Sequence, residues 1–174
     1  VAALDRAGEL VRIREPVSLD LELTEIADRT MKQPGGGKAI LVEQPLLMNG
    51  KRSEFPVGIN LFGSMRRMSM ALGVNDLDEI GGRITELLQT KPPEGVIAKL
   101  AMLPRLLEVA KFPPRRKSGT APSQEIVWRD GDVDLDRLPL MKCWPEDGGA
   151  YITVPMVITR DPKRGIRNVG MYRI

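Results

Sequence analysis

The chain has 174 residues, of which 42% are hydrophobic, 28% charged and 4% aromatic, with a formal net charge of +3. This composition is typical of a globular chain with an aliphatic core, long enough for one sizeable domain or for a domain and part of another. The single cysteine excludes an internal disulfide framework, and no apolar run approaches the ~20 residues of a membrane span. We therefore expect a cytoplasmic protein, and no secretory signal is visible.

A strand and a helix are expected first. Residues 10–13 (LVRI) predict a short alternating strand. Asp20 has the side chain to cap a following helix, which should end near Met31, before Pro34. Four residues of this helix share one face: Leu23, Ile26, Ala27 and Thr30.

A glycine-rich loop and two buried strands are predicted next. Residues 35–38 (GGGK) resemble part of a phosphate-binding loop. The first glycine of that motif and the Ser/Thr after its lysine are missing, so an ordinary loop is the better interpretation. Residues 39–42 and 55–60 are apolar runs bounded by proline and glycine, typical of buried strands in an α/β layer.

A capped helix is predicted after residue 63. Ser64 can cap a helix that runs to Leu72 and stops at Gly73. Met65 and Met68 fall at helical spacing on it, and we expect them to fill gaps in the core.

Two further helices are predicted. Asp76, with Glu79 three residues later, forms an Asp-led variant of a capping box. Residues 96–109 continue in a helical pattern that Pro104 interrupts. The apolar side chains of the helix after Asp76 are expected to form a core face: Leu77, Ile80, Ile84, Leu87 and Leu88.

Residues 111–122 (KFPPRRKSGTAP) are rich in basic residues and proline and lack periodicity, which favours an exposed linker. We place a domain boundary here, with an N-terminal α/β domain over residues 1–115 and the start of a second domain over residues 116–174. A patch for nucleic acid or anionic lipid is the alternative. Between nucleic acid and anionic lipid as ligands of such a patch, we prefer contact with a membrane surface and expect no nucleic-acid partner.

Residues 125–128 predict a strand, and aspartates follow at alternate positions over residues 130–136. This spacing resembles a Ca²⁺ loop, but Leu135 stands where glycine is needed and Met141 where glutamate is needed. A solvated turn is therefore preferred. Cys143 is expected to pack without reacting, because the chain has no histidine to activate it.

The last stretch, residues 151–174, predicts a β-hairpin. Residues 152–158 alternate between apolar and mixed side chains, residues 161–165 (DPKRG) supply turn residues, and Ile166 restarts an extended run. In that second run the Asn168 carbonyl suits Mg²⁺, Mn²⁺ or K⁺, and Arg173 offers a fork for phosphate or carboxylate. From the residues alone, a hairpin that only packs remains an alternative.

Together these residues resemble the UbiD-type decarboxylases, which remove CO₂ from aromatic and α,β-unsaturated acids with prenylated FMN. The resemblance is strongest to the 3-polyprenyl-4-hydroxybenzoate decarboxylases of ubiquinone biosynthesis. It implies an α/β N-terminal domain followed by the first strands of a split β-barrel of the flavin-binding type. Its landmarks occur in order over nearly the whole chain: residues 23–29 (LTEIADR), 60–64 (NLFGS), 143–149 (CWPEDGG), 151–153 (YIT), 159–162 (TRDP) and 168–173 (NVGMYR).

Carried over residue by residue, the resemblance implies that Asn168 is a metal ligand and that Met171, Tyr172 and Arg173 contact the cofactor. It also implies a catalytic role for Arg173. The implied cofactors are prenylated FMN and Mn²⁺ or a similar divalent cation, with K⁺ as a further candidate. Asn168 and Arg173 would face opposite sides of a regular strand, so we expect a bulge, most easily at Gly170.

In the family the other metal ligands, a His and a Glu, and further acidic residues lie downstream, whereas this chain has no histidine. We therefore expect the N-terminal part of such an enzyme, inactive alone. The resemblance implies a homo-oligomer acting on an aromatic or polyprenylated acid, with peripheral membrane contact suggested by the polyprenyl tail. The alternatives are a non-catalytic flavin-binding module and a structural module for assembly.

Overall fold

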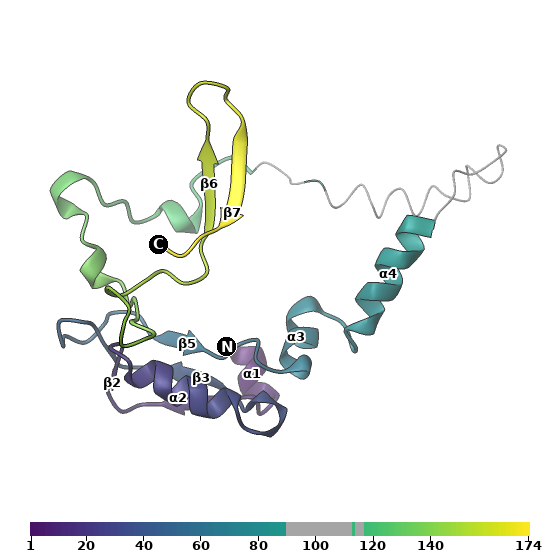
Figure 1. Cartoon of the computed structure of the whole chain (residues 1–174), viewed down its shortest axis with the longest axis horizontal. Coiled ribbons are helices and arrows are strands. Elements are labelled where there is room, and N and C mark those ends of the chain that lie inside the picture. The colour runs from purple at the N-terminus through teal and green to yellow at the C-terminus, as the bar shows by residue number, and fades with distance from the viewer. Residues whose placement is uncertain (90–112, 114–116) are drawn as a thin grey trace. The chain divides into compact units, whose positions relative to one another are not determined.

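A computed structural model of the chain describes residues 1–89, 113 and 117–174 (Figure 1). The chain divides into two compact units, one of residues 1–77 with 134–174 and one of residues 78–133. The helix predicted over residues 96–109 lies outside the described residues, as do the expected domain boundary and part of the basic linker. In the part of the chain that is described, no helix is both long enough and apolar enough to cross a membrane.

The first unit is built on a small mixed sheet, in the order β1 (Leu10–Ile13), β3 (Ala39–Val42) and β5 (Val57–Ile59). β1 runs parallel to β3, and β5 runs antiparallel to it with Ile59 opposite Ile40. All four residues of the central strand β3 are buried, as its apolar run predicts. The predictions of these strands are confirmed, although β5 is shorter than expected.

The core forms where helix α2 (Glu22–Met31) meets the strands. A second pair of strands, β2 (Val17–Ser18) and β4 (Pro45–Leu46), is formed by two strands that run parallel to each other. A short helix, α1 (Ala2–Arg6), precedes β1. The helix ends at Met31, as predicted, and buries two residues of its expected face. The buried core cluster consists of Val17, Leu19, Leu23, Ile40, Val42, Leu47 and Val57.

The start of α2 differs from the prediction. Leu21 is the N-cap residue, with φ 67° and no side-chain cap, so the expected cap by Asp20 is wrong. Asp20 instead forms a parallel β-bridge with Lys142, whose N–H donates to the Leu19 carbonyl at 3.0 Å. Pairing with a distant segment therefore decides the backbone here, ahead of the local capping preference.

Helix α3 (Met65–Leu72) is capped as predicted. The Ser64 hydroxyl accepts from the Arg67 N–H at 3.2 Å, and the helix ends at a left-handed glycine, Gly73. Met65, however, is 71% exposed, and the buried residues of α3 are Arg67 and Ser69. Met65 is therefore not a core residue. The helix turns a polar side inward because buried carbonyl groups there need a donor.

In the second unit, α4 (Asp78–Gln89) has no buried residue, so the expected core face is not buried within the described residues. The strand predicted at residues 125–128 is wrong, since residues 122–124 form a 3₁₀ turn and Ile126 is exposed. Without a partner strand among the described residues, an extended segment cannot satisfy its backbone as a ladder. The aspartate-rich residues 130–137 form two exposed 3₁₀ turns.

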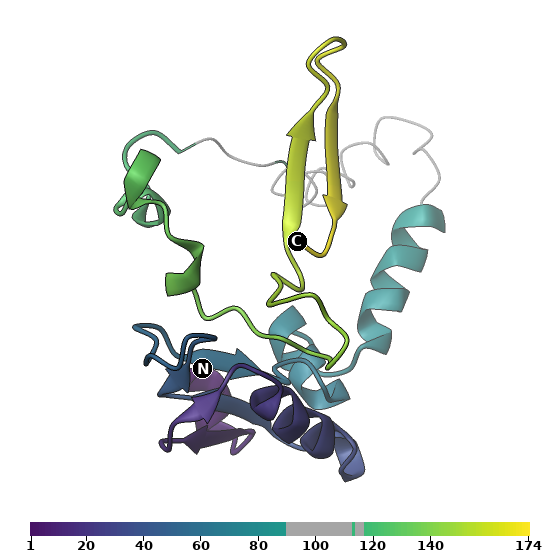
Figure 2. The same ribbon diagram turned by 60° about the vertical axis from the view of Figure 1, so that its left-hand side comes forward.

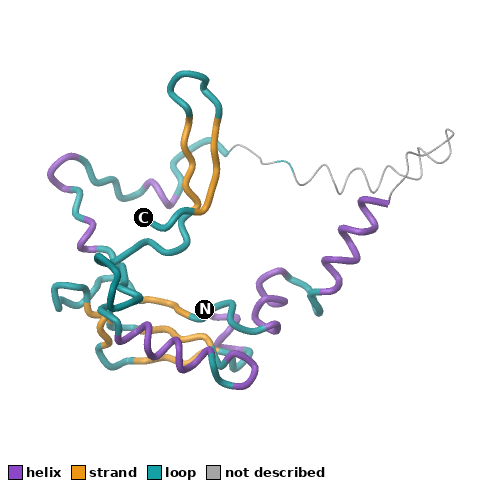
Figure 3. Tube along the Cα trace, viewed as in Figure 1, coloured by secondary structure: helices purple, strands orange, loops and turns teal. Residues whose placement is uncertain are grey.

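The predicted hairpin is confirmed, with β6 (Met156–Arg160) antiparallel to β7 (Arg167–Met171) (Figures 2 and 3). Its turn is held by Asp161, whose Oδ1 accepts from the Lys163 and Arg164 N–H groups at 2.7 and 3.1 Å. The first strand begins at Met156, later than predicted, because Pro155 has no N–H to donate to a ladder.

Candidate functional site

The site residues predicted from the sequence lie on β7 and just after it. The ladder runs regularly past Gly170, which lies opposite Val157, so the bulge expected at Gly170 is absent. The pairing changes beyond the strand instead, where Ile152 and Ile174 exchange hydrogen bonds of 2.8 and 3.2 Å. Since Met156 pairs with Met171, residues 152–156 contain one residue more than the segment opposite.

Asn168 and Tyr172 meet on one side of the hairpin. The Asn168 side-chain N–H donates to the Tyr172 hydroxyl at 3.3 Å. The Tyr172 ring lies over Gly170, where an added methyl group would come within 2.5 Å of the ring. Gly170 therefore provides the space for this ring. The contact directs the amide nitrogen to Tyr172 and leaves the Asn168 Oδ1 available to a cation.

Arg173, beyond the end of β7, is held by Asp147 and Tyr151. Its Nη1 and Nη2 donate to the Asp147 Oδ1 and Oδ2 at 3.2 and 2.6 Å, a parallel pair of charge-assisted bonds. Its guanidinium carbon lies 3.9 Å from the centre of the Tyr151 ring, close enough for a cation–π contact. The Arg173 side chain is 39% exposed and that of Asp147 only 12%. The Arg173 side chain is thus held in place while part of it stays exposed.

Asp147 is itself fixed by its own turn. Its Oδ2 accepts from the Trp144 N–H at 3.1 Å, and its N–H donates to the Trp144 carbonyl at 3.0 Å. The hydrogen bond from Arg173 lowers the pKa of Asp147, against the opposing effect of burial, and the same bond raises the pKa of Arg173. Both groups are therefore ionised at neutral pH.

The structure joins the predicted residues into two pairs rather than one site. Asn168 contacts Tyr172, Arg173 contacts Asp147, and no hydrogen bond between described residues joins Asn168 to Arg173. Met171 projects outward from β7 and is 72% exposed. Sequence reasoning missed Asp147 as the partner of Arg173. The carboxylate in residues 143–149 (CWPEDGG) could have suggested a partner for the arginine, but these residues served only to support the family resemblance.

The residues fit part of a metal and flavin site. Asn168 offers one hard oxygen donor on an exposed strand, suited to Mn²⁺, Mg²⁺ or K⁺. Among residues 1–89 and 117–174, no three Cys, Asp or Glu side chains gather into a metal-binding group. The donor set is therefore that of a single ligand, and the open edge of Arg173 suits an anionic group.

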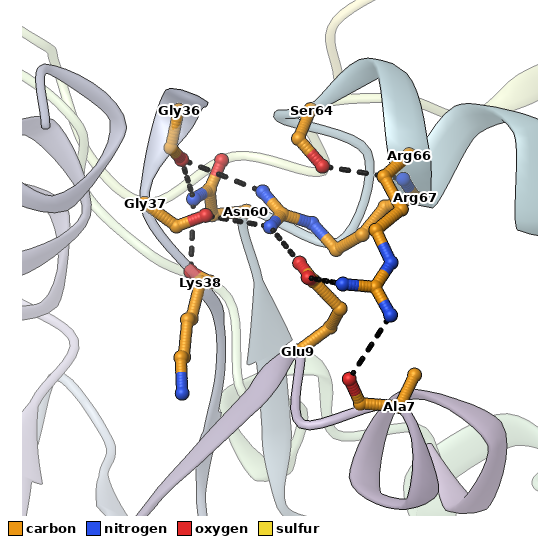
Figure 4. A network of polar contacts seen from close by, with 9 residues as sticks. All are labelled: Ala7, Glu9, Gly36, Gly37, Lys38, Asn60, Ser64, Arg66 and Arg67. Atoms are coloured by element: carbon orange, nitrogen blue, oxygen red, sulfur yellow. Dashed lines mark hydrogen bonds and ion pairs between the residues drawn. The ribbon is translucent and has the colours of Figure 1, made fainter. Parts of the chain in front are cut away.

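A second polar cluster lies in the first unit around Arg67, whose side chain is fully buried (Figure 4). Its Nη1 donates to the Glu9 Oε2 at 3.0 Å and to the Gly37 carbonyl at 2.6 Å. Asn60 Nδ2 donates to the Gly36 and Lys38 carbonyls at 2.9 and 3.0 Å. All of these donors serve groups of the fold, so this cluster attaches the glycine loop to α3 and is structural.

The cluster explains the glycine run that resembled a phosphate loop. Gly36 has φ 82°, and an added methyl group would lie 1.8 Å from the Gly63 carbonyl oxygen. The glycines are therefore required by close approach of two backbone segments. This supports the interpretation of residues 35–38 as an ordinary loop.

A hollow of about 660 Å³ lies between α2 and residues 143–145. Its lining includes Leu21, Met31 and Ile59 together with Cys143 and Trp144. The surface is mostly apolar, and Cys143 is half-buried against it. That Cys143 serves in packing stays a prediction.

Two family matches cover most of the chain. Residues 1–84 match the 3-octaprenyl-4-hydroxybenzoate carboxy-lyase N-terminal domain, and residues 115–174 match the 3-octaprenyl-4-hydroxybenzoate carboxy-lyase Rift-related domain. A protein of Aquifex aeolicus is 44% identical over 171 residues, and one of Archaeoglobus fulgidus is 43% identical over 174 residues. Both are described only as uncharacterised, and this chain spans 34% of the length of each.

Solved structures of a UbiD-class enzyme and of a vanillic acid decarboxylase resemble the chain. One is the enzyme HmfF from Pelotomaculum thermopropionicum in complex with FMN, 26% identical, with a TM-score of 0.64 over 99% of this chain and 32% of that one. An evolved dimeric form of HmfF in complex with prFMN gives the same identity and TM-score. The vanillic acid decarboxylase of Sedimentibacter hydroxybenzoicus is 25% identical, with a TM-score of 0.68 over 99% of this chain and 33% of that one.

Proposed function

Because the chain belongs to the UbiD family of carboxy-lyases, we propose that it supplies part of the active site of a decarboxylase for an aromatic or unsaturated carboxylic acid. The family description favours a 3-polyprenyl-4-hydroxybenzoate, the acid of ubiquinone biosynthesis, as the substrate. The resemblance to vanillic acid decarboxylase supports the wider class of aromatic acids. Prenylated FMN is the proposed cofactor, since relatives bind FMN and prFMN.

The observation that carries the proposal is the placement of Arg173. Asp147 and Tyr151 hold its guanidinium while the side chain stays 39% exposed. An arginine fork fits a planar carboxylate through parallel hydrogen bonds, so Arg173 binds the carboxylate that leaves as CO₂. Bound prenylated FMN supplies the covalent chemistry of the reaction, and the protein binds and orients the reacting groups.

The neighbouring residues complete this half of the proposed site. Asn168 gives its amide oxygen to Mn²⁺ or a similar divalent cation, or to K⁺, which would anchor the flavin phosphate. Met171 and Tyr172 would contact the cofactor. The orientation of the Asn168 amide by the Tyr172 hydroxyl supports this arrangement.

We assign the hairpin to the start of a split β-barrel. One face of β6 and β7 presents Met156, Ile158, Val169 and Met171, each more than half exposed. Further strands of a barrel would cover such a face. A homo-oligomer is the proposed assembly, and the evolved dimeric form of HmfF supports it. Peripheral membrane contact stays a prediction, because Lys111, Arg115 and Arg116 lie outside the described residues.

The test is Arg173→Lys in the complete gene product that contains this chain. Lysine keeps the charge but loses the fork, so CO₂ release should fall at least about ten-fold at equal flavin absorbance. Arg164→Lys, in the exposed hairpin turn, is the matched control and should leave the rate unchanged. Equal rates for Arg173→Lys and wild type would contradict a role for Arg173 in the reaction. Bound flavin with no CO₂ release from the wild type would favour a flavin-binding module instead.

A second test addresses the metal. Asn168→Ala removes a hard oxygen ligand, so the complete protein should lose metal and flavin together. Thr159→Ala, at the position opposite Asn168, is the control. Metal content by elemental analysis and flavin content by absorbance give the answer. Unchanged contents in Asn168→Ala would remove Asn168 from the ligand set.

A further inference from the structure

Asp147 occupies one edge of the Arg173 guanidinium, and the side chain as a whole is 39% exposed. Asp147 accepts hydrogen bonds from Nη1 and Nη2, which takes up the end of the group. The Nε–H and the remaining Nη2–H point in parallel from the side of the same plane. No described residue accepts a hydrogen bond from Arg173 Nε. Among the described residues the side edge therefore has no hydrogen-bond partner, so it can receive a second carboxylate in parallel geometry.

Tyr151 covers one face of the same group. Its ring centre lies 3.9 Å from the guanidinium carbon, and its own N–H donates to the Met141 carbonyl at 3.1 Å. Asp147 is anchored in turn by the Trp144 N–H. Both neighbours of Arg173 are thus fixed through backbone hydrogen bonds. The long arginine side chain receives its orientation from short segments on a different part of the chain.

We propose that Asp147 and Tyr151 are positioning residues for Arg173, which set the plane of its guanidinium so that the open side edge meets the substrate carboxylate. The inference rests on the proposed function of Arg173 and adds residues that act through it. It also predicts an unusual kinetic signature. The negative charge of Asp147 opposes a second carboxylate at the same arginine, so its contribution is to orientation and not to the strength of binding.

The first test is Asp147→Asn in the complete gene product with its flavin bound. Asparagine still accepts from the Trp144 N–H, so the turn is kept, but the charge and one of the two acceptors for Arg173 are lost. We expect kcat to fall about ten-fold while KM stays equal or decreases and flavin occupancy is unchanged. Asp161→Asn is the matched control, because that carboxylate also holds a turn and bonds no arginine side chain among the described residues. An unchanged kcat in Asp147→Asn would overturn the proposal.

The second test is a double-mutant cycle with Arg173→Lys. If Asp147 acts through Arg173, the loss in kcat for the double variant should be much smaller than the product of the two single losses. Independent, multiplying losses would mean that Asp147 has only a structural role. At Tyr151, phenylalanine keeps the ring face and should keep kcat, whereas leucine should lower it. Equal kcat for the two Tyr151 variants would remove Tyr151 from the proposal.

A binding measurement separates this inference from the proposed function. Calorimetry on the complete protein compares benzoate, a planar carboxylate, with benzenesulfonate, a tetrahedral anion. An oriented fork should favour benzoate, and Asp147→Asn should reduce the ratio of the two affinities several-fold. A wild type that releases no CO₂ would refute the proposed function, while the ratio would still decide the positioning. A ratio that is unaffected by Asp147→Asn would refute the positioning alone.

Discussion

The N-terminal sheet and the C-terminal hairpin carry similar apolar side chains but bury them differently. Val42 on β3 is fully buried, whereas Val169 on β7 is 53% exposed. In the first case α2 and the neighbouring strands surround the side chain, and in the second no described element covers that face of the hairpin. The N-terminal part therefore supplies the stable scaffold, while the hairpin presents its surface for binding or for further strands.

The two arginines that matter most show the same contrast. Arg67 is fully buried and donates to Glu9 and to the carbonyls of Gly36 and Gly37. Arg173 donates to one carboxylate, and its side chain is 39% exposed. A fully buried arginine that bonds to the fold is structural, whereas an arginine whose side chain is partly exposed can bind a ligand. The following predictions test this division, beginning with the largest effect.

Arg67→Ala should lower the free energy of unfolding by about 3 kcal/mol, because it leaves the Gly37 carbonyl and the Glu9 Oε2 without the donor that they share. Arg66→Ala is the matched control on the next residue. Arg66 also bonds Glu9, but its side chain is 64% exposed, so its loss should cost less than about 1 kcal/mol. Urea unfolding of the chain, followed by circular dichroism, gives both values. Similar losses for the two variants would contradict the structural role of Arg67.

Val42→Ala and Val169→Ala delete the same atoms from the two regions. Val42→Ala should lower the free energy of unfolding by about 2.5 kcal/mol, because two buried methyl groups are no longer removed from water and a cavity is left behind. The exposed site should lose less than about 0.5 kcal/mol. The same unfolding measurement decides, and a comparable loss at Val169 would mean that the hairpin face is covered in solution.

Gly170→Ala should change the free energy of unfolding by less than about 1 kcal/mol, because the clash is with the movable Tyr172 ring. The added methyl group would nevertheless come within 2.5 Å of that ring, so the ring must leave. We expect the contact between the Asn168 side-chain amide and the Tyr172 ring to disappear from nuclear Overhauser spectra. Its persistence would show that Gly170 is not needed for the placement of Tyr172.

The smallest expected effect is a pH dependence of stability from the pair of Asp147 and Arg173. The arginine holds the pKa of Asp147 below its usual range. The unfolded chain therefore takes up this proton at a higher pH than the folded chain, and the stabilisation is lost as pH falls through the lowered pKa. Above the usual range of aspartate, wild type should be more stable than Asp147→Asn. The difference should vanish in more acidic solution, and a difference that grows towards acid would disprove the assignment.

Several features of this protein followed from the sequence alone, because they depend on neighbouring residues. The cap by Ser64, the end of α2 at Met31 and the turn at Asp161 all rest on hydrogen bonds or dihedral preferences within a few positions. The apolar run of β3 also predicted its burial. The roles of Asn168 and Arg173 came from the family resemblance, because the residues alone left a hairpin that only packs as an alternative.

Tertiary structure decided the features that depend on distant residues. Asp20 lost its expected role because Lys142 pairs with that backbone, and Met65 turned outward because Arg67 serves carbonyl groups from another loop. The partner of Arg173 is 26 positions away in the sequence, and nothing in the local pattern around Arg173 specifies it. Long-range contacts of this kind arise only when the chain is packed, because local propensity contains no information on which segments meet.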